Sequence, residues 1–157
     1  METIKKYRLE LDAERHPVLV KEAEYLCARR LNNSDEVVAL CNSVYRLQYM
    51  AEEYVIMLAA DVQGRVLGIF EVSHGSVNQS MCNAREIYER ALVVGASGII
   101  VVHNHPSGYV NPSKDDLACA EKLEKAGNLL GIKLMDFIII GNVEYYSRME
   151  QEDCSSE

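Results

Sequence analysis

A short apolar segment, Gly98 to Val102, runs directly into a histidine pair and a proline. Such a run of glycine and β-branched residues is typical of a buried strand. Pro106 restricts His105 to an extended conformation, so strand geometry continues through the pair. Because residues two apart on an extended chain point to the same side, His103 and His105 can both reach one metal ion. The segment therefore predicts a buried strand that ends in a metal site. For the histidine pair taken alone, the alternative to metal binding is that both are ordinary polar residues at the end of a strand.

A serine and an aspartate follow the histidines at the start of an expected helix. Ser113 and Asp116 have the spacing of a capping box, in which each side chain accepts a hydrogen bond from the backbone of the other. Such a cap would place Asp116 on the first turn, facing the histidine loop, whereas Asp115 is expected to face solvent. His103, His105 and Asp116 then form a ligand set for zinc, with a fourth position open for water as in catalytic sites.

Two glutamates are candidates for the proton-transfer group that such a site requires. Glu71 interrupts the apolar run Leu67 to Val72, where a carboxylate is costly unless it is paired or functional. The alternative is that Glu71 lies on the solvent side of an edge strand. Glu86 stands three residues after Asn83 and is fully explained as part of a helix cap. We therefore expect Glu71 to be the general base.

The chain is predicted to form an N-terminal extension, one domain and a short tail. The extension is residues 1–33, with a strand over 4–11 and a helix over 18–30 from the spacing of apolar residues. The domain is residues 34–150. The polar residues 151–157 form a tail that is expected to fray from about residue 150.

Within the domain, periodicity and caps predict a mixture of helices and strands. The expected helices cover residues 34–50, 83–95 and 113–131, and the expected strands cover 54–60, 66–72, 99–103, 134–140 and 143–147. Ser34 is expected to cap the first of these helices. Turns at 61–64 and 141–142 indicate two hairpins. The fold class predicted is an α/β sandwich with a mixed sheet.

Composition limits the class of protein. A chain of 157 residues with 48% hydrophobic content can form one compact domain with its own core. The formal net charge of -8 gives no general attraction to phosphate backbones, so nucleic-acid binding is disfavoured. The five cysteines form no C-x-x-C pair, which favours free thiols over a cysteine-bound zinc. No apolar stretch approaches the roughly 20 residues of a membrane span and no signal peptide is visible, so we expect a cytoplasmic protein.

The motif residues, taken together, resemble a known family. H-x-H-P followed by S-x-x-D resembles the JAMM motif of the MPN-type metalloproteases. The string from His103 to Gly108 is similar to the bacterial RadC branch, as are four shorter pieces: Glu71 with Gly75-Ser76, Arg85-Glu86, Gly131 to Asp136, and Ile138 to Gly141. The resemblance covers residues 35–148. Tyr109 stands where the branch often has aspartate, and the helix-hairpin-helix region of full-length RadC proteins is absent, so a short stand-alone form is expected.

The resemblance implies a fold, a ligand set and catalytic roles. The fold implied is the MPN/JAB type, a three-layer arrangement with a curved mixed sheet flanked by helices, similar to cytidine deaminases. His103, His105 and Asp116 would bind Zn2+. Glu71 would hold the zinc-bound water and act as general acid and base. Ser113 would help to stabilise the oxyanion of the tetrahedral intermediate.

The function implied is a zinc-dependent hydrolase, a metallopeptidase or isopeptidase that cleaves an amide bond. The residues leave open whether the substrate is a peptide, an isopeptide or another amide, and they leave the oligomeric state open. A non-catalytic MPN-type binding or scaffold module is the alternative, although such modules usually lack one ligand. A nucleobase deaminase is disfavoured because its H-x-E and P-C-x-x-C motifs are absent. The RadC family carries a DNA-repair label that these residues do not support, and no nucleic-acid or membrane partner is expected.

Overall fold

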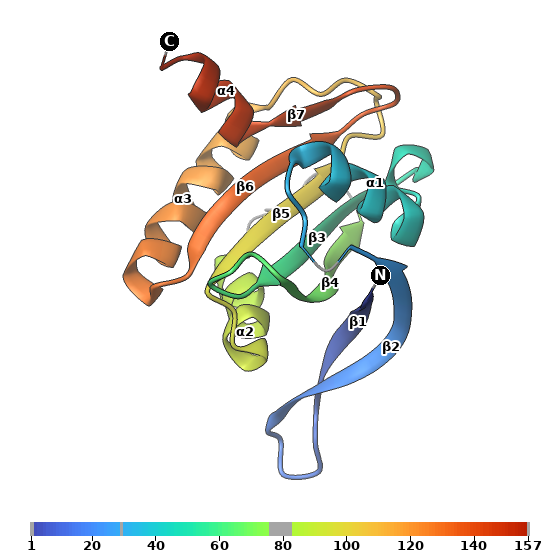
Figure 1. Cartoon of the computed structure of the whole chain (residues 1–157), viewed down its shortest axis with the longest axis vertical. Coiled ribbons are helices and arrows are strands. Elements are labelled where there is room, and N and C mark those ends of the chain that lie inside the picture. Colours follow the sequence, from blue (N-terminus) through green and yellow to red (C-terminus); the bar gives the residue numbers. More distant parts are fainter. Residues whose placement is uncertain (1, 29, 76–82, 157) are drawn as a thin grey trace.

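The computed structural model describes residues 2–28, 30–75 and 83–156 (Figure 1). These residues form a seven-stranded sheet with helices on both faces. In chain order, the elements are β1 (Glu2–Leu11), β2 (Pro17–Cys27), α1 (Ser34–Tyr45), a 3-10 turn (Leu47–Tyr49), β3 (Glu53–Ala60), β4 (Val66–Gly75), α2 (Ala84–Val94), β5 (Gly98–Asn104), α3 (Lys114–Leu130), β6 (Lys133–Ile140), β7 (Tyr145–Ser147) and α4 (Arg148–Cys154). No helix in these ranges is long and apolar enough to cross a lipid bilayer.

The sheet is mixed, as predicted, with the strand order β2-β1-β4-β3-β5-β6-β7. The central strand β3 pairs antiparallel with β4 and with β5, and the predicted β3–β4 hairpin is confirmed. β5 and β6 are parallel, and α3 connects them across one face of the sheet. Because α3 starts where β5 ends, the histidines and Asp116 meet at the same edge of the sheet.

Two hydrophobic cores lie on the two faces of the sheet, which gives the three layers expected. α2 and α3 cover one face, here called the α3 face, where they pack on Val55 and Met57 of β3. α1 covers the other face, here called the α1 face, where it packs on Ile56 and Leu58 of the same strand. Neighbouring residues of β3 therefore point into opposite cores, as strand alternation requires.

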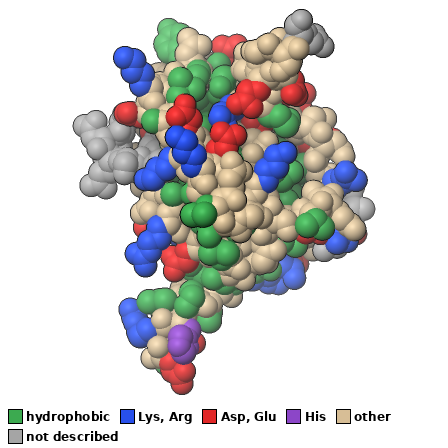
Figure 2. Space-filling view, turned by 90° about the vertical axis from the view of Figure 1, so that its left-hand side faces the viewer, with side chains coloured by type: hydrophobic (Ala, Val, Ile, Leu, Met, Phe, Trp, Pro, Cys, Tyr) green, Lys and Arg blue, Asp and Glu red, His purple; other side chains and the backbone are tan. Residues whose placement is uncertain are grey.

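The segment predicted as a helix over 18–30 is instead strand β2. It pairs antiparallel with β1 along its whole length, and β1 in turn pairs in parallel with β4. Apolar residues at these spacings fit a strand as well as a helix, and the pairing with β1, which a local pattern does not reveal, decides between the two. The side chain of Asp12 closes the turn by accepting hydrogen bonds from the N–H groups of Glu14 and His16. Figures 1 and 2 show the far end of this hairpin projecting from the body of the molecule.

The first helix differs from expectation at both ends. Its N-cap is Asn33 and not Ser34, because the Asn33 side chain accepts a hydrogen bond from the N–H of Glu36 at 2.9 Å. The helix ends at Tyr45 and does not continue to residue 50. Arg46 adopts a left-handed conformation with φ of 54°, which ends the helix, and the 3-10 turn follows. The predicted caps of α2 and α3, by contrast, are confirmed.

The C-terminal segment that was expected to fray forms α4. Ser147 caps this helix by accepting a hydrogen bond from the N–H of Glu150. Buried Asp136 of β6 accepts further hydrogen bonds from the Ser147 hydroxyl at 2.7 Å and from the N–H of Met149 at 3.0 Å. A carboxylate at a helix N-terminus is favourable because the free N–H groups and the helix dipole both attract negative charge. A distant residue thus holds a polar segment in helical form.

Candidate metal centre

The two histidines lie at the end of β5, on the α3 face. His103 is 1% exposed, and its ring packs edge-on against Phe137 with 5.4 Å between ring centroids. His105 lies one residue beyond the strand, and its ring centroid is 4.9 Å from that of His103. The two imidazoles are therefore on the same side of the chain, as the sequence predicts.

Asp116 reaches the histidines from the first turn of α3. Its two carboxylate oxygens lie 3.2 Å from Nε2 of His103 and 3.2 Å from Nε2 of His105. The capping box is present, because the N–H of Ser113 donates to Oδ2 of Asp116 at 2.7 Å and the N–H of Asp116 donates to the Ser113 hydroxyl oxygen at 3.0 Å. One carboxylate, 2% exposed, therefore serves both the cap and the site. Asp115 is exposed, as expected.

The three side chains fit a metal ion. Each offers one ligand atom, and the three atoms lie within 4.8 Å of one another. Tetrahedral zinc, with bonds of about 2.0–2.1 Å, would separate its ligand atoms by about 3.3 Å, close to the distances between Asp116 and the histidines. Neither ring nitrogen of buried His103 has a hydrogen-bond partner among the residues that the structure describes. Because an unpaired buried nitrogen is costly, an ion bound at Nε2 would stabilise the site. Imidazole and carboxylate ligands suit zinc but also other divalent metals.

The loop after β5 orients His105. The Nδ1 atom of His105 lies 2.9 Å from the carbonyl oxygen of Tyr109, and this oxygen can only accept a hydrogen bond. Nδ1 therefore carries the hydrogen of the neutral ring, which leaves the Nε2 lone pair available to a metal ion, whereas in the protonated ring Nε2 donates to Asp116. Without a metal ion, the hydrogen bond to Asp116 is the main reason that the pKa of His105 is raised, with burial opposing it. Burial opposes ionisation of Asp116, but the two histidines beside it and the N–H of Ser113 together outweigh burial and lower the pKa of that carboxyl.

Backbone contacts hold this loop against the turn between β6 and β7. The N–H of His105 donates to the carbonyl of Ile140 at 3.0 Å. Gly108 adopts φ of 85°, and its carbonyl accepts a hydrogen bond from the N–H of Asn142 at 3.2 Å. A Cβ on Gly141 would clash with the carbonyl oxygen of Gly108, so the two loops approach this closely only with glycine there.

The buried side chain of Asn104 fixes the start of β3 beside the histidines. Its Oδ1 accepts a hydrogen bond from the N–H of Tyr54 at 2.7 Å, and its Nδ2 donates to the carbonyl of Glu52 at 2.9 Å. Both bonds flank Glu53, so the backbone of this residue is held at a defined position next to β5.

Glu53 is an acid beside the site that the sequence reasoning missed. Val55 pairs with His103, and the same register continued by two residues brings Glu53 opposite His105. Glu53 shares the α3 face with Val55, because alternate residues of a strand point the same way. Its charge adds to the raised pKa of His105, after the larger effect of Asp116. No local sequence signal identifies Glu53, because its position beside His105 depends on the pairing of β3 with β5.

Glu71 lies on the other face of the sheet. It pairs with Ile56, whose side chain belongs to the α1-face core, and directly paired residues share a face. Phe70, immediately before it, points into the α3-face core. Burial is the main cause that raises the pKa of Tyr45 on α1, and the Glu71 carboxylate is the next cause. The same carboxylate lies 3.6 Å from Nδ1 of His74. The expectation that Glu71 stands beside the histidines is therefore revised, because alternation directs it to the α1 face.

The other residues singled out in the sequence have clear positions. Ser113 is exposed at the rim of the site, and its hydroxyl oxygen accepts a hydrogen bond within the capping box. The N–H of Glu86, in the first turn of α2, donates to the Asn83 side chain at 3.4 Å, which is the Asn83 half of the predicted capping box. The metal-competent group of His103, His105 and Asp116 does not include Glu86. Ser76 lies outside the described residues.

A mixed sheet between helical layers, with a His-His-Asp group where β5 meets α3, is the arrangement of a JAB/MPN-type domain. The chain belongs to the family of RadC-like JAB domains, whose model matches residues 31–153, and the family predicted from the motif is thereby confirmed.

Similar proteins in other organisms are described as UPF0758 proteins. The one from Thermotoga maritima is 34% identical over 146 residues, which cover 93% of this chain and 62% of the relative. The one from Streptococcus suis is 34% identical over 134 residues, 85% of this chain and 54% of the relative. The one from Pelobacter propionicus is 40% identical over 107 residues, 68% of this chain and 47% of the relative. The chain thus spans about half the length of the curated relatives it matches.

Proposed function

We propose that this chain is a metal-dependent hydrolase of amide bonds, with zinc as its metal and a peptide or isopeptide as its substrate. The observation that carries the proposal is the buried group of His103, His105 and Asp116 with the carboxylate of Glu53 beside it. Three protein ligands leave a fourth position for water, which distinguishes catalytic zinc sites from structural ones. A binding module would need no such open position.

Each residue of the site has a role in the proposed reaction. His103, His105 and Asp116 would hold the ion, which would polarise the substrate carbonyl and lower the pKa of a water molecule. Glu53 would accept a proton from the attacking water and return it to the leaving nitrogen as the carbon–nitrogen bond breaks. Asn104 would keep Glu53 in place through its two backbone hydrogen bonds.

Ser113 is proposed to stabilise the oxyanion that forms when water attacks the carbonyl. The oxygen of its hydroxyl accepts the N–H of Asp116, so the hydroxyl hydrogen is available for donation. Its exposed position at the rim of the site leaves room for a substrate beside it.

Two matched variants, Glu53→Gln and Glu71→Gln, test the assignment of the base. Each removes one carboxylate from neighbouring strands of the sheet and keeps the side-chain size. Hydrolysis of a panel of fluorogenic peptides and isopeptides should fall by about two to four orders of magnitude in Glu53→Gln, because general base catalysis is lost. Glu71→Gln should hydrolyse like the parent. Activity lost only in Glu71→Gln would return the base role to Glu71.

Zinc content measured on the same proteins tests the site itself. We expect about one zinc per chain in the parent and in both glutamine variants, since neither glutamate is a ligand, and little in His105→Ala or Asp116→Ala. A well-folded parent that holds no zinc after supplementation would overturn the hydrolase proposal. The non-catalytic binding module would then be the better account.

A further inference from the structure

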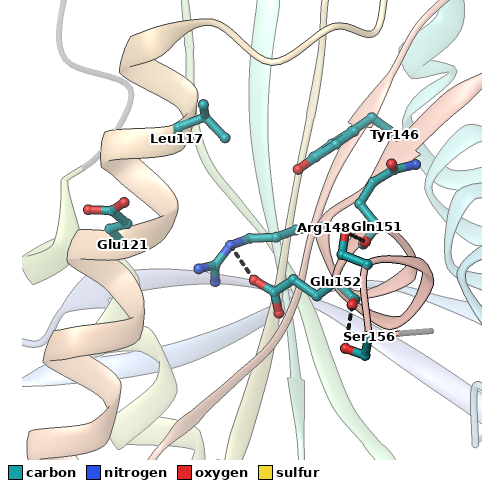
Figure 3. Close-up of a pocket in the computed structure, with 8 residues that line it drawn as sticks. Leu117, Glu121, Tyr146, Arg148, Gln151, Glu152 and Ser156 are labelled. Atoms are coloured by element: carbon teal, nitrogen blue, oxygen red, sulfur yellow. Dashed lines mark hydrogen bonds and ion pairs between the residues drawn. The ribbon is translucent and has the colours of Figure 1, made fainter.

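A groove lies between α3 and α4 on the α3 face of the sheet (Figure 3). Its volume is about 490 Å³. The wall from α3 carries Leu117 and Glu121, and the opposite wall carries Tyr146 of β7 with Arg148 and Glu152 of α4. The groove is open to solvent, so an extended chain can enter it.

One end of the groove adjoins the metal centre. Leu117 directly follows Asp116 on α3. On the other wall, Tyr146 pairs with Ile139, which pairs with His103, so Tyr146 lies two strands from that ligand, a distance of about 10 Å. Tyr146 packs against the same α3-face core as the metal ligands' strand. A substrate whose scissile bond lies at the metal centre would therefore continue into this groove.

The groove carries an excess of negative charge. The Arg148 guanidinium lies 3.0 Å from the carboxylate of Glu124 and 3.2 Å from that of Glu152, so its charge is neutralised by two acids. Glu121 is exposed and forms no ion pair within the described part of the chain. Figure 2 shows acidic side chains on this face toward the end of the molecule that carries α4, with lysine and arginine side chains among them. The charge favours a basic occupant and disfavours an acidic one.

The distance along α3 indicates which residue of a bound peptide would lie beside Glu121. Glu121 is five residues after Asp116, which corresponds to about 7.5 Å along the helix axis. An extended peptide advances about 3.3 Å per residue, so the separation along the helix axis corresponds to about two residues of a peptide that runs along α3. Leu117, which is 44% exposed, lies between them and can contact an apolar side chain next to that bond.

We propose that the groove between α3 and α4 binds the substrate on one side of the scissile amide and selects a lysine or arginine about two residues from it. The residue next to the bond is apolar and packs on Leu117 and Tyr146. This inference rests on the proposed hydrolase function for its reference point, the scissile bond, but the binding itself requires no turnover.

Labelled hexapeptides that differ at one position test the groove. Lysine, glutamine or glutamate is placed two residues to either side of a central bond flanked by an apolar residue. Binding is followed by fluorescence anisotropy on zinc-supplemented Glu53→Gln, and cleavage is followed with the parent. At low salt, the lysine peptide of one series should bind about two- to fivefold more tightly than its glutamine counterpart, the effect of one exposed charge pair. Raising the salt concentration should reduce the preference.

Charge reversal supplies the matched control. Glu121→Lys should invert the order of the lysine and glutamate peptides, whereas Glu14→Lys, the same change at the far hairpin tip, should keep the parent order. Equal binding of all peptides, no binding at all, or a preference that survives Glu121→Lys would overturn the groove proposal. Selective binding without cleavage would support the groove proposal and count against the hydrolase proposal. Cleavage without charge preference would support the hydrolase proposal and count against the groove proposal.

Discussion

The carboxylate of Asp116 faces both histidines, so its protonation is linked to theirs and to metal binding. Without metal, the raised pKa of His105 stabilises the fold below about 6.5, and this contribution is lost as the pH rises through the folded value. The lowered pKa of Asp116 makes stability depend on pH in the opposite direction. It stabilises the fold above the ordinary value of 3.8 and is lost as the pH falls toward the folded value.

Metal affinity should therefore depend on pH through His105. Its Nε2 binds an ion only when deprotonated, so zinc affinity should rise about tenfold per pH unit up to the raised pKa of His105 and then level off. Competition with a chromophoric chelator between pH 5.5 and 8 measures this slope. The thermal stability of the metal-free protein should fall over the upper part of the same range. A zinc affinity independent of pH would contradict the ligand role of His105.

The ligands could be predicted from sequence because each depends on a local signal. Strand alternation and Pro106 place the histidines, and the spacing of Ser113 and Asp116 predicts the capping box. The base could not be predicted in this way. Whether Glu53 or Glu71 stands beside His105 depends on strand register and on the face of the sheet that each residue occupies. The residues next to Glu53 or Glu71 in the sequence encode neither the strand register nor the face of the sheet.

At the scale of elements, the contact between the histidine loop and the β6–β7 turn should control metal affinity. Gly141→Ala introduces a Cβ that clashes with the carbonyl of Gly108, and relief of the clash must shift the loop that carries His105 and Tyr109. We expect zinc affinity to fall by about tenfold or more, as for other changes that disturb the orientation of a ligand. Isothermal titration with zinc measures the effect.

Gly131→Ala is the matched control for this prediction. Gly131 also has positive φ, 73°, but a Cβ there has no neighbour within 4 Å. This variant should lose about 1 kcal/mol of stability through backbone strain and keep the parent zinc affinity. Equal zinc affinities in the two variants would show that the loop contact does not position His105.

Element boundaries were predictable where the stabilising groups are close in sequence. Asn83 and Gly95 bound α2 at the expected places, since a cap and a left-handed glycine act within one turn. The local pattern of β2 predicts a helix, and the segment is a strand because its partner β1 supplies the hydrogen bonds. The polar composition of α4 predicts a frayed tail, and the segment is helical because Asp136, from β6, accepts a hydrogen bond from its first turn.

At the scale of the whole molecule, the N-terminal hairpin is part of the sheet. Ile4 is buried in the α1-face core, and Tyr7 stacks on Phe70 with 5.8 Å between ring centroids. Ile4→Ala should therefore lower the free energy of unfolding by about 2–5 kcal/mol, as for other large-to-small core changes. Leu11→Ala, at a residue 48% exposed, should change it by less than about 0.5 kcal/mol. Urea denaturation of both variants measures the difference, and similar values would mean that the hairpin does not contribute to the core.

A metal ion would also join distant parts of the fold, because its ligands come from the end of β5 and the start of α3. Binding to the folded state alone stabilises it by about 4 kcal/mol when free zinc is about a thousand times its dissociation constant. For a domain of this size, that stabilisation corresponds to a rise in melting temperature of roughly 10 °C. Calorimetry with graded zinc, followed by addition of a chelator, should show the melting temperature rise and then return. Asp116→Ala, which lacks a ligand, should melt at the same temperature with and without zinc. A parent whose melting temperature ignores both zinc and chelator would show that the three side chains hold no zinc in the folded protein.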